Sequence, residues 1–125
     1  MYIDTNHLLR YMLSDIPEQS EKAAEAVAEG AAIYPEIVPE AVYVLHKIYG
    51  IGRKDVAYAL LDVLDEIEVE RKEQIREALS LFKETRLDYV DCLLLAGFLS
   101  GKNDFVTFDR KLRNKKISLS SNEKE

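Results

Sequence analysis

The sequence predicts an α/β domain in which a mostly parallel sheet carries helices on both faces. Short apolar runs alternate along the chain with longer segments of helical periodicity. Glycine and proline residues separate many of these segments, as is typical of junctions between strands and helices. Strands that alternate with helices usually pair in parallel through right-handed crossovers, so we expect one sheet of that kind. A chain of 125 residues is long enough for a single domain with its own core.

The first half of the chain contains three predicted strands and four predicted helices. Residues 1–4 form the first strand, and Thr5 or Asn6 is the expected cap of the helix that follows. Pro17 and Pro39 should each lie in the first turn of a helix, because a proline deeper inside would remove a backbone hydrogen bond. The other strands are expected at 31–34 and 67–69, and the helices at 6–14, 17–29, 36–49 and 53–64.

The second half contains two predicted helices and two predicted strands. One helix is expected at 71–85, and Asp88 should cap another that ends near Ser100. A buried strand is expected at 104–108 and a short one at 117–119. We therefore assign the domain to residues 1–119 and expect residues 120–125 to fray.

The composition is that of a protein from a reducing compartment. The single Cys92 allows no internal disulfide bond. The chain opens without a basic and apolar signal peptide, and its longest apolar stretch, near residues 92–99, is too short to span a bilayer. We therefore expect a soluble cytoplasmic protein with no membrane partner.

The charge is unevenly distributed along the chain. A net charge of -6 argues against a broad affinity of the whole surface for nucleic acid. One segment, which directly follows Asp109, is nevertheless strongly basic. It could contact the phosphates of a polyanion, or it could be a solvated helix whose cations favour the macrodipole. Its basic residues are Arg110, Lys111, Arg113, Lys115 and Lys116.

Four acidic residues stand at positions where an α/β chain gathers metal ligands. Asp4 and Asp109 each end an apolar run, and Glu40 and Asp91 lie near predicted helix starts. Ligands of open parallel sheets sit beyond the carboxyl ends of the strands, so these four carboxylates could meet in one pocket. Hard oxygen ligands favour Mg²⁺ or Mn²⁺. Each residue also has a purely structural explanation, as a turn former, a surface carboxylate or a helix cap.

Four motifs in order resemble those of PIN-domain ribonucleases, and most closely those of VapC-type toxins from toxin–antitoxin pairs. The resemblance covers essentially the whole chain. The motifs are Ile3-Asp4-Thr5-Asn6, Pro39-Glu40-Ala41-Val42-Tyr43-Val44-Leu45, Asp88-Tyr89-Val90-Asp91-Cys92-Leu93-Leu94-Leu95-Ala96, and Phe105-Val106-Thr107-Phe108-Asp109-Arg110-Lys111-Leu112.

The resemblance implies a fold, an activity and partners. It implies a three-layer α/β/α sandwich, cleavage of RNA with Mg²⁺ or Mn²⁺, homodimers, and a small antitoxin that places a basic side chain near the acidic residues. Asp4, Glu40, Asp91 and Asp109 match the acidic metal site of the family. Asn6 and Thr107 match its neighbouring polar positions, where they would hold the carboxylates by hydrogen bonds.

Other functions remain open from the sequence. The chain could be an RNA-processing PIN nuclease outside a toxin pair, or a catalytically silent PIN-like domain. It could also be an acidic-site phosphatase, although a haloacid-dehalogenase-like enzyme would have a second aspartate where Asn6 stands, and a receiver domain would have adjacent acids after its first strand. His7 and His46 lack the spacing of a zinc site.

Overall fold

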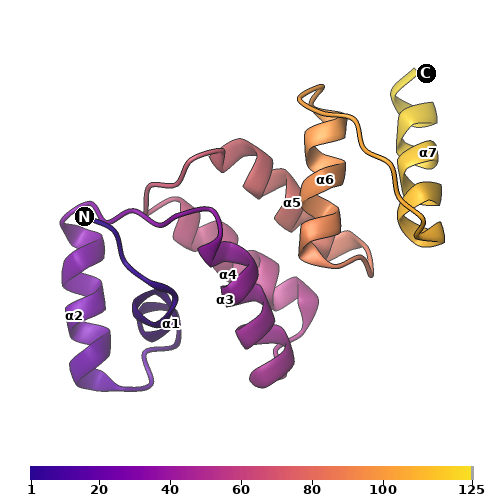
Figure 1. Ribbon diagram of the computed structural model, residues 1–125. Helices are drawn as coiled ribbons and strands as arrows, with labels where there is room; N and C mark the ends of the chain where they lie inside the picture. Colours follow the sequence, from indigo (N-terminus) through magenta and orange to yellow (C-terminus); the bar gives the residue numbers. More distant parts are fainter. Residues whose placement is uncertain (125) are drawn as a thin grey trace. The chain divides into compact units, whose positions relative to one another are not determined.

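The computed structural model describes the backbone of residues 1–124 and the side chains of residues 1–120. Contacts divide the chain into two compact units, Met1–Lys72 and Glu73–Glu125. Helices make up most of the described chain (Figure 1). None of the helices in the described part is long and apolar enough to cross a membrane.

The first unit contains the helices that the periodicity predicts. They are α1 (Thr5–Leu13), α2 (Pro17–Ala28), α3 (Ile37–Tyr43) and α4 (Arg53–Leu64), and α3 continues into a π-helical turn, η1 (Val44–Ile48). Pro39 lies in the first turn of α3, where the N–H that it lacks would have no intrahelical partner. The predictions for Pro17 and Pro39 are therefore confirmed.

The three predicted strands of this unit pair in parallel but only through isolated bridges. Ala32 bridges Tyr2 on one side and Glu68 on the other. The N–H of Ile3 donates to the carbonyl of Ala32 at 2.9 Å, and the N–H of Ile33 donates to that of Glu68 at 2.9 Å. Gly30, at a φ of 90°, and Pro35 bound the middle segment closely. The parallel direction is as predicted, but the described residues do not confirm an extended central sheet or a three-layer sandwich.

The second unit consists of helices and connecting loops in the part that the structure describes. Its helices are α5 (Lys72–Glu84, beginning at the last residue of the first unit), α6 (Tyr89–Leu99) and α7 (Arg110–Lys124). The predicted strand at 117–119 is wrong, because these residues lie within α7. The helix also covers residues 120–124, which we expected to fray, and residue 125 lies outside the described part.

The predicted buried strand at 104–108 is also wrong. Its backbone has no ladder partner among the described residues, and the side chains of Val106 and Phe108 are fully exposed. Phe105 alone in this segment is buried. Its ring packs edge to face against the ring of Phe98, with 5.9 Å between the ring centroids. The segment is therefore held by the packing of the Phe105 ring and by Lys116, which contacts Asp104 and the carbonyl of Phe105, rather than by strand pairing.

Gly97 shows how tightly α6 packs in this unit. A Cβ atom at this position would lie 1.9 Å from Oδ1 of Asn103 and 2.9 Å from Nε2 of Gln74. Gln74 is itself buried and donates to the carbonyl of Leu93 at 3.1 Å. Glycine costs a helix interior about 1 kcal/mol relative to alanine, and here it makes room for these neighbours.

Candidate active site

Asp4 caps the first turn of α1 and is held by His7. Its Oδ1 accepts the backbone N–H of His7 at 2.9 Å and lies 3.0 Å from Nδ1 of the same residue. These contacts, the backbone hydrogen bond first, lower the pKa of Asp4 below its ordinary value of 3.8. The prediction that Thr5 or Asn6 caps this helix is wrong, because Asp4 occupies the cap position. The structure thus keeps the Asp4 carboxylate ionised and oriented.

Thr5 connects Glu40 to the segment that carries Asp4. Glu40 lies in the first turn of α3, and its Oε2 accepts a hydrogen bond from Oγ1 of Thr5. Asn6, which we expected to hold a carboxylate by a hydrogen bond, is exposed on α1 and lines a pocket between α1 and α2. The sequence offers one signal for Thr5, a hydroxyl directly beside Asp4, but it does not show the partner.

In the second unit, Asp91 is crowded by other carboxylates. It lies half-buried in the first turn of α6. Burial raises its pKa above the ordinary value of 3.8, and the negative charges of Asp88 and Asp109 raise it further. Asp88 is at the cap position of α6, but its side chain makes no capping hydrogen bond within the described residues. A bound cation would relieve the repulsion among these carboxylates.

Asp109 is fixed at the start of α7. Its Oδ2 accepts the backbone N–H of Leu112 at 2.8 Å, so it caps this helix. Oγ1 of Thr107 accepts the N–H of Asp109 at 3.0 Å. Thr107 therefore positions the backbone of Asp109, whereas we expected it to hold the carboxylate directly.

The four acidic residues share one structural position, the N-terminal end of a helix. Asp4 and Asp109 are at caps, and Glu40 and Asp91 are in first turns. Unpaired N–H groups and the positive end of the helix dipole favour ionised carboxylates there. Asp4 and Glu40 belong to the first unit, and Asp91 and Asp109 to the second. The expectation that all four meet in one pocket stays a prediction.

The chemistry of these donors fits a hard divalent cation. Among the described residues, no three His, Cys, Asp or Glu side chains are close enough to form a ready metal cage. Mg²⁺ does not require such a cage, because it retains several waters and usually takes one or two direct carboxylates. The four carboxylates are oxygen donors of this kind. Both histidines contact other groups of the protein. Nδ1 of His46 lies 2.8 Å from the carbonyl oxygen of Ile51, and Nδ1 of His7 contacts the carboxylate of Asp4.

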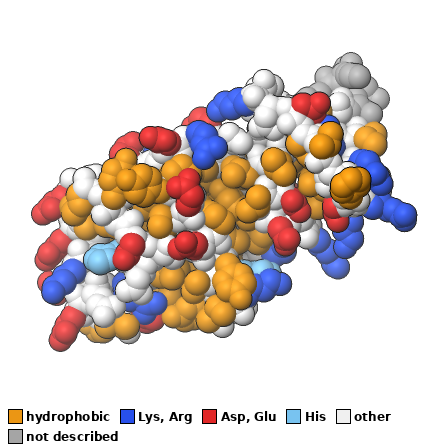
Figure 2. Space-filling view, viewed as in Figure 1, with side chains coloured by type: hydrophobic (Ala, Val, Ile, Leu, Met, Phe, Trp, Pro, Cys, Tyr) orange, Lys and Arg blue, Asp and Glu red, His pale blue; other side chains and the backbone are white. Residues whose placement is uncertain are grey.

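The basic segment forms the first turns of α7, where Figure 2 shows Lys and Arg side chains gathered. Its side chains differ in their availability. Arg110, Lys111 and Arg113 are exposed, and Lys115 is half-buried. Lys116 is half-buried and is held by contacts within the second unit.

Lys116 connects α7 to the preceding loop and to α6. Its Nζ lies 2.7 Å from Oδ1 of Asp104 and donates to the carbonyl of Phe105 at 2.6 Å. The same nitrogen lies 4.9 Å from the centroid of the Phe98 ring and 4.7 Å from that of Phe105. These contacts favour a structural role for Lys116 over the predicted contact with RNA.

The ion pair between Lys116 and Asp104 predicts a pH dependence of stability. The hydrogen bond from Lys116, followed by that from the N–H of Phe105, lowers the pKa of Asp104 below 3.8. Because the folded state has the lower pKa, the pair stabilises the protein above pH 3.8 and loses this effect as the pH falls through the lowered pKa. We expect Asp104→Asn to reduce the loss of stability on acidification. Urea unfolding at a series of pH values would measure the stability of the wild type and of Asp104→Asn. The same loss of stability on acidification in the two proteins would contradict the role of this ion pair.

The family of the chain follows from comparison with known proteins. The family model of the PIN domain matches residues 1–117. The chain therefore belongs to the PIN domain family, whose members are generally nucleases, and this supports a nuclease function. No curated protein and no solved structure matches the chain.

Proposed function

We propose that the protein is a metal-dependent endoribonuclease and the toxin of a toxin–antitoxin pair. The observation that carries the proposal is the PIN match over residues 1–117, a range that includes all four motif acids. The position of each acid at a helix N-terminus supports it, because ionised carboxylates are suited to Mg²⁺ or Mn²⁺. The order of the motifs, which resembles that of the toxins, supports the narrower assignment.

In this proposal, the acidic residues have different tasks. Asp4 and Asp91 are the principal metal ligands, Glu40 orients water or completes the ligand shell, and Asp109 supports them. A bound divalent ion supplies Lewis acidity at the phosphoryl oxygen and lowers the pKa of a bound water.

The chain's own contacts prepare these side chains for their tasks. His7 holds Asp4 ionised in a fixed orientation, and Thr5 holds Glu40. Thr107 fixes the backbone of Asp109. Such supporting contacts limit how far a ligand can turn, which matters for both metal affinity and activity.

The exposed cations at the start of α7 are proposed to bind the RNA backbone. Contacts with phosphate position a strand without reading its sequence, and an unpaired strand or loop is the substrate that the family resemblance implies. The antitoxin and the homodimer are part of the same proposal, because that resemblance implies both. An antitoxin with a basic side chain would compete with the metal ion for the acidic residues.

Charge reversal in α7 is expected to weaken RNA binding and to reduce its salt dependence. Lys111→Glu and Arg113→Glu should each lower the slope of log affinity against log salt by about 1, if each side chain contacts one phosphate. Fluorescence anisotropy with a labelled RNA at several salt concentrations would measure the slope. Lys102→Glu makes the same charge change at an exposed position before α7 and should leave the slope unchanged. Equal slopes for all the proteins would contradict the assignment.

The activity itself can be tested with a mixed pool of structured and single-stranded RNAs. We expect the purified protein to cut internal phosphodiester bonds with Mg²⁺ or Mn²⁺ and to stop in EDTA. A small phosphoester should not be hydrolysed, which separates the proposal from a phosphatase. A folded, metal-loaded protein that cleaves no RNA in the pool would contradict it.

A further inference from the structure

The pocket that Asn6 lines lies between α1 and α2 in the first unit. Its volume is about 250 Å³, and five side chains line it. Each of the five carries N–H donors, either as an amide or as a basic group, and none is a carboxylate. Such a lining suits an oxyanion. The residues are Asn6, His7, Arg10, Gln19 and Lys22.

Helical spacing brings these side chains to the same place. Asn6 and Arg10 are four residues apart on α1, and Gln19 and Lys22 are three residues apart on α2. Residues at these separations share one face of a helix. Oγ of Ser20 on α2 donates to the carbonyl of Arg10 at 2.9 Å, so the two helices that form the pocket are also tied together.

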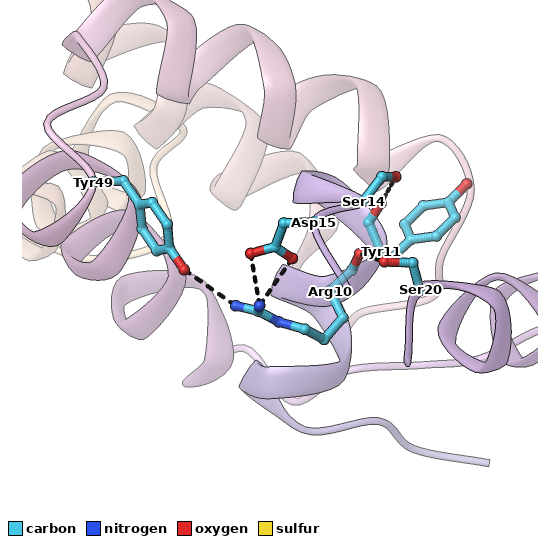
Figure 3. A network of polar contacts seen from close by, with 6 residues as sticks. All are labelled: Arg10, Tyr11, Ser14, Asp15, Ser20 and Tyr49. Atoms are coloured by element: carbon cyan, nitrogen blue, oxygen red, sulfur yellow. Dashed lines mark hydrogen bonds and ion pairs between the residues drawn. The ribbon is translucent and has the colours of Figure 1, made fainter. Parts of the chain in front are cut away.

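Arg10 is the fixed wall of this pocket. Its side chain is only 10% exposed, and its Nη1 lies 2.8 Å from both carboxylate oxygens of Asp15. Its Nη2 donates to the hydroxyl of Tyr49 at 3.3 Å, and Figure 3 shows these contacts holding the guanidinium. A buried arginine fixed in this way is already ordered before any ligand binds.

One donor of Arg10 has no partner. Its Nε is buried without a hydrogen bond among the described residues. Unpaired buried donors are unfavourable, and native structures usually pair them with water or an ion. Asp15 balances the charge of the guanidinium, so the additional positive charge at the pocket comes from Lys22.

The pocket lies next to Asp4, one of the four acidic residues of the proposed nuclease. His7 lines both this pocket and a larger one of about 430 Å³, and Asp4 lines the larger one. Nδ1 of His7 lies 3.0 Å from Oδ1 of Asp4, so a side chain that lines the smaller pocket contacts Asp4 directly. Lys22 also lines both. A phosphate group in the smaller pocket would therefore lie close to Asp4.

We infer that the pocket between α1 and α2 binds a phosphate group of the RNA strand next to Asp4. The choice of RNA as the source of that phosphate rests on the proposed function. The anion site itself rests on the donor lining, the fixed Arg10 and its unpaired Nε. It adds a substrate contact on the first unit to the basic residues of α7.

Binding measurements in EDTA can test this site without any cleavage. Isothermal titration calorimetry of the full chain would use two probes, inorganic phosphate and a short single-stranded oligoribonucleotide. Lys22→Glu should weaken both affinities about tenfold, as expected for losing one charged hydrogen bond. Gln19→Glu, a second exposed position, should act in the same direction. Lys102→Glu makes the same charge change as Lys22→Glu outside the pocket and should have no effect on phosphate binding.

The possible outcomes test three claims separately: the anion site, RNA as the source of its phosphate, and the proposed nuclease function. Equal affinities of wild type, Lys22→Glu and Gln19→Glu for both probes would overturn the site. Weakened binding of inorganic phosphate with unchanged binding of the oligoribonucleotide would overturn RNA as its source. Weakened binding of both probes, in a protein that cleaves no RNA with metal, would support the site and contradict the proposed function. Matching circular dichroism spectra and urea midpoints would show that the variants are folded.

Discussion

Replacing Asp4 by asparagine is expected to lower metal-dependent RNA cleavage about a thousandfold while the protein stays folded. Asparagine caps helices as well as aspartate does, and its amide oxygen can accept the N–H of His7. The substitution therefore removes the negative charge and little else. A divalent ion supplies several kcal/mol of charge stabilisation, and about 4 kcal/mol corresponds to a thousandfold in rate. Single-turnover cleavage in Mg²⁺ would measure the rate, and urea unfolding would show that the variant stays folded.

Asp55 provides a matched control for this experiment. It is an exposed aspartate in the first turn of α4, so Asp55→Asn removes the same charge from a similar helical position outside the motifs. We expect this variant to cleave at the wild-type rate. An Asp4→Asn protein that retains full activity would refute the assignment of Asp4 as a metal ligand. A loss of activity that accompanies unfolding would refute the expectation that this position tolerates asparagine.

Replacing Leu112 by alanine is expected to lower the free energy of unfolding by about 2–5 kcal/mol. Its side chain is only 1% exposed, whereas α7 is otherwise largely polar. The backbone N–H of Leu112 also binds Oδ2 of Asp109, so the same turn holds the acidic and basic residues at the start of α7. The loss of this anchor should weaken RNA binding as well. Urea denaturation followed by circular dichroism would measure the stability.

Ile117 lies on the same helix and tests whether burial is the cause. Its side chain is 58% exposed, so Ile117→Ala should change the free energy of unfolding by no more than about 0.5 kcal/mol. Comparable destabilisation by both substitutions would contradict burial of the Leu112 side chain as the cause.

Helices α1 to α6 could be predicted from the sequence because their determinants are local, whereas residues 117–119 of α7 were wrongly predicted as a strand. Apolar spacing, Pro17 and Pro39 lie within the helices that they define, and the observed boundaries of α1 to α6 agree closely with those expected. Strand pairing depends on residues far apart in the chain. The segment around Val106 and Phe108 has the composition of a buried strand, yet both side chains are exposed and no described segment pairs with it.

The candidate site shows the same division between local and distant information. The motifs identify Asp4, Glu40, Asp91 and Asp109, but they do not reveal which neighbours hold them. The contact between Thr5 and Glu40 joins residues 35 positions apart, and no local pattern predicts it. Lys116 looks like its neighbours in the basic segment, and only the structure shows its ties to Asp104 and Phe105.

The most direct test of the nuclease proposal compares two neighbouring aspartates in one cleavage assay. Asp91→Asn and Asp88→Asn each remove one negative charge from the start of α6, and Asp88 makes no capping hydrogen bond within the described residues. With the mixed RNA pool, we expect wild type and Asp88→Asn to cleave RNA in Mg²⁺ but not in EDTA. We expect Asp91→Asn to cleave no RNA in either condition. Equal cleavage by the two variants, or wild-type cleavage that persists in EDTA, would contradict a metal-dependent nuclease that works through Asp91.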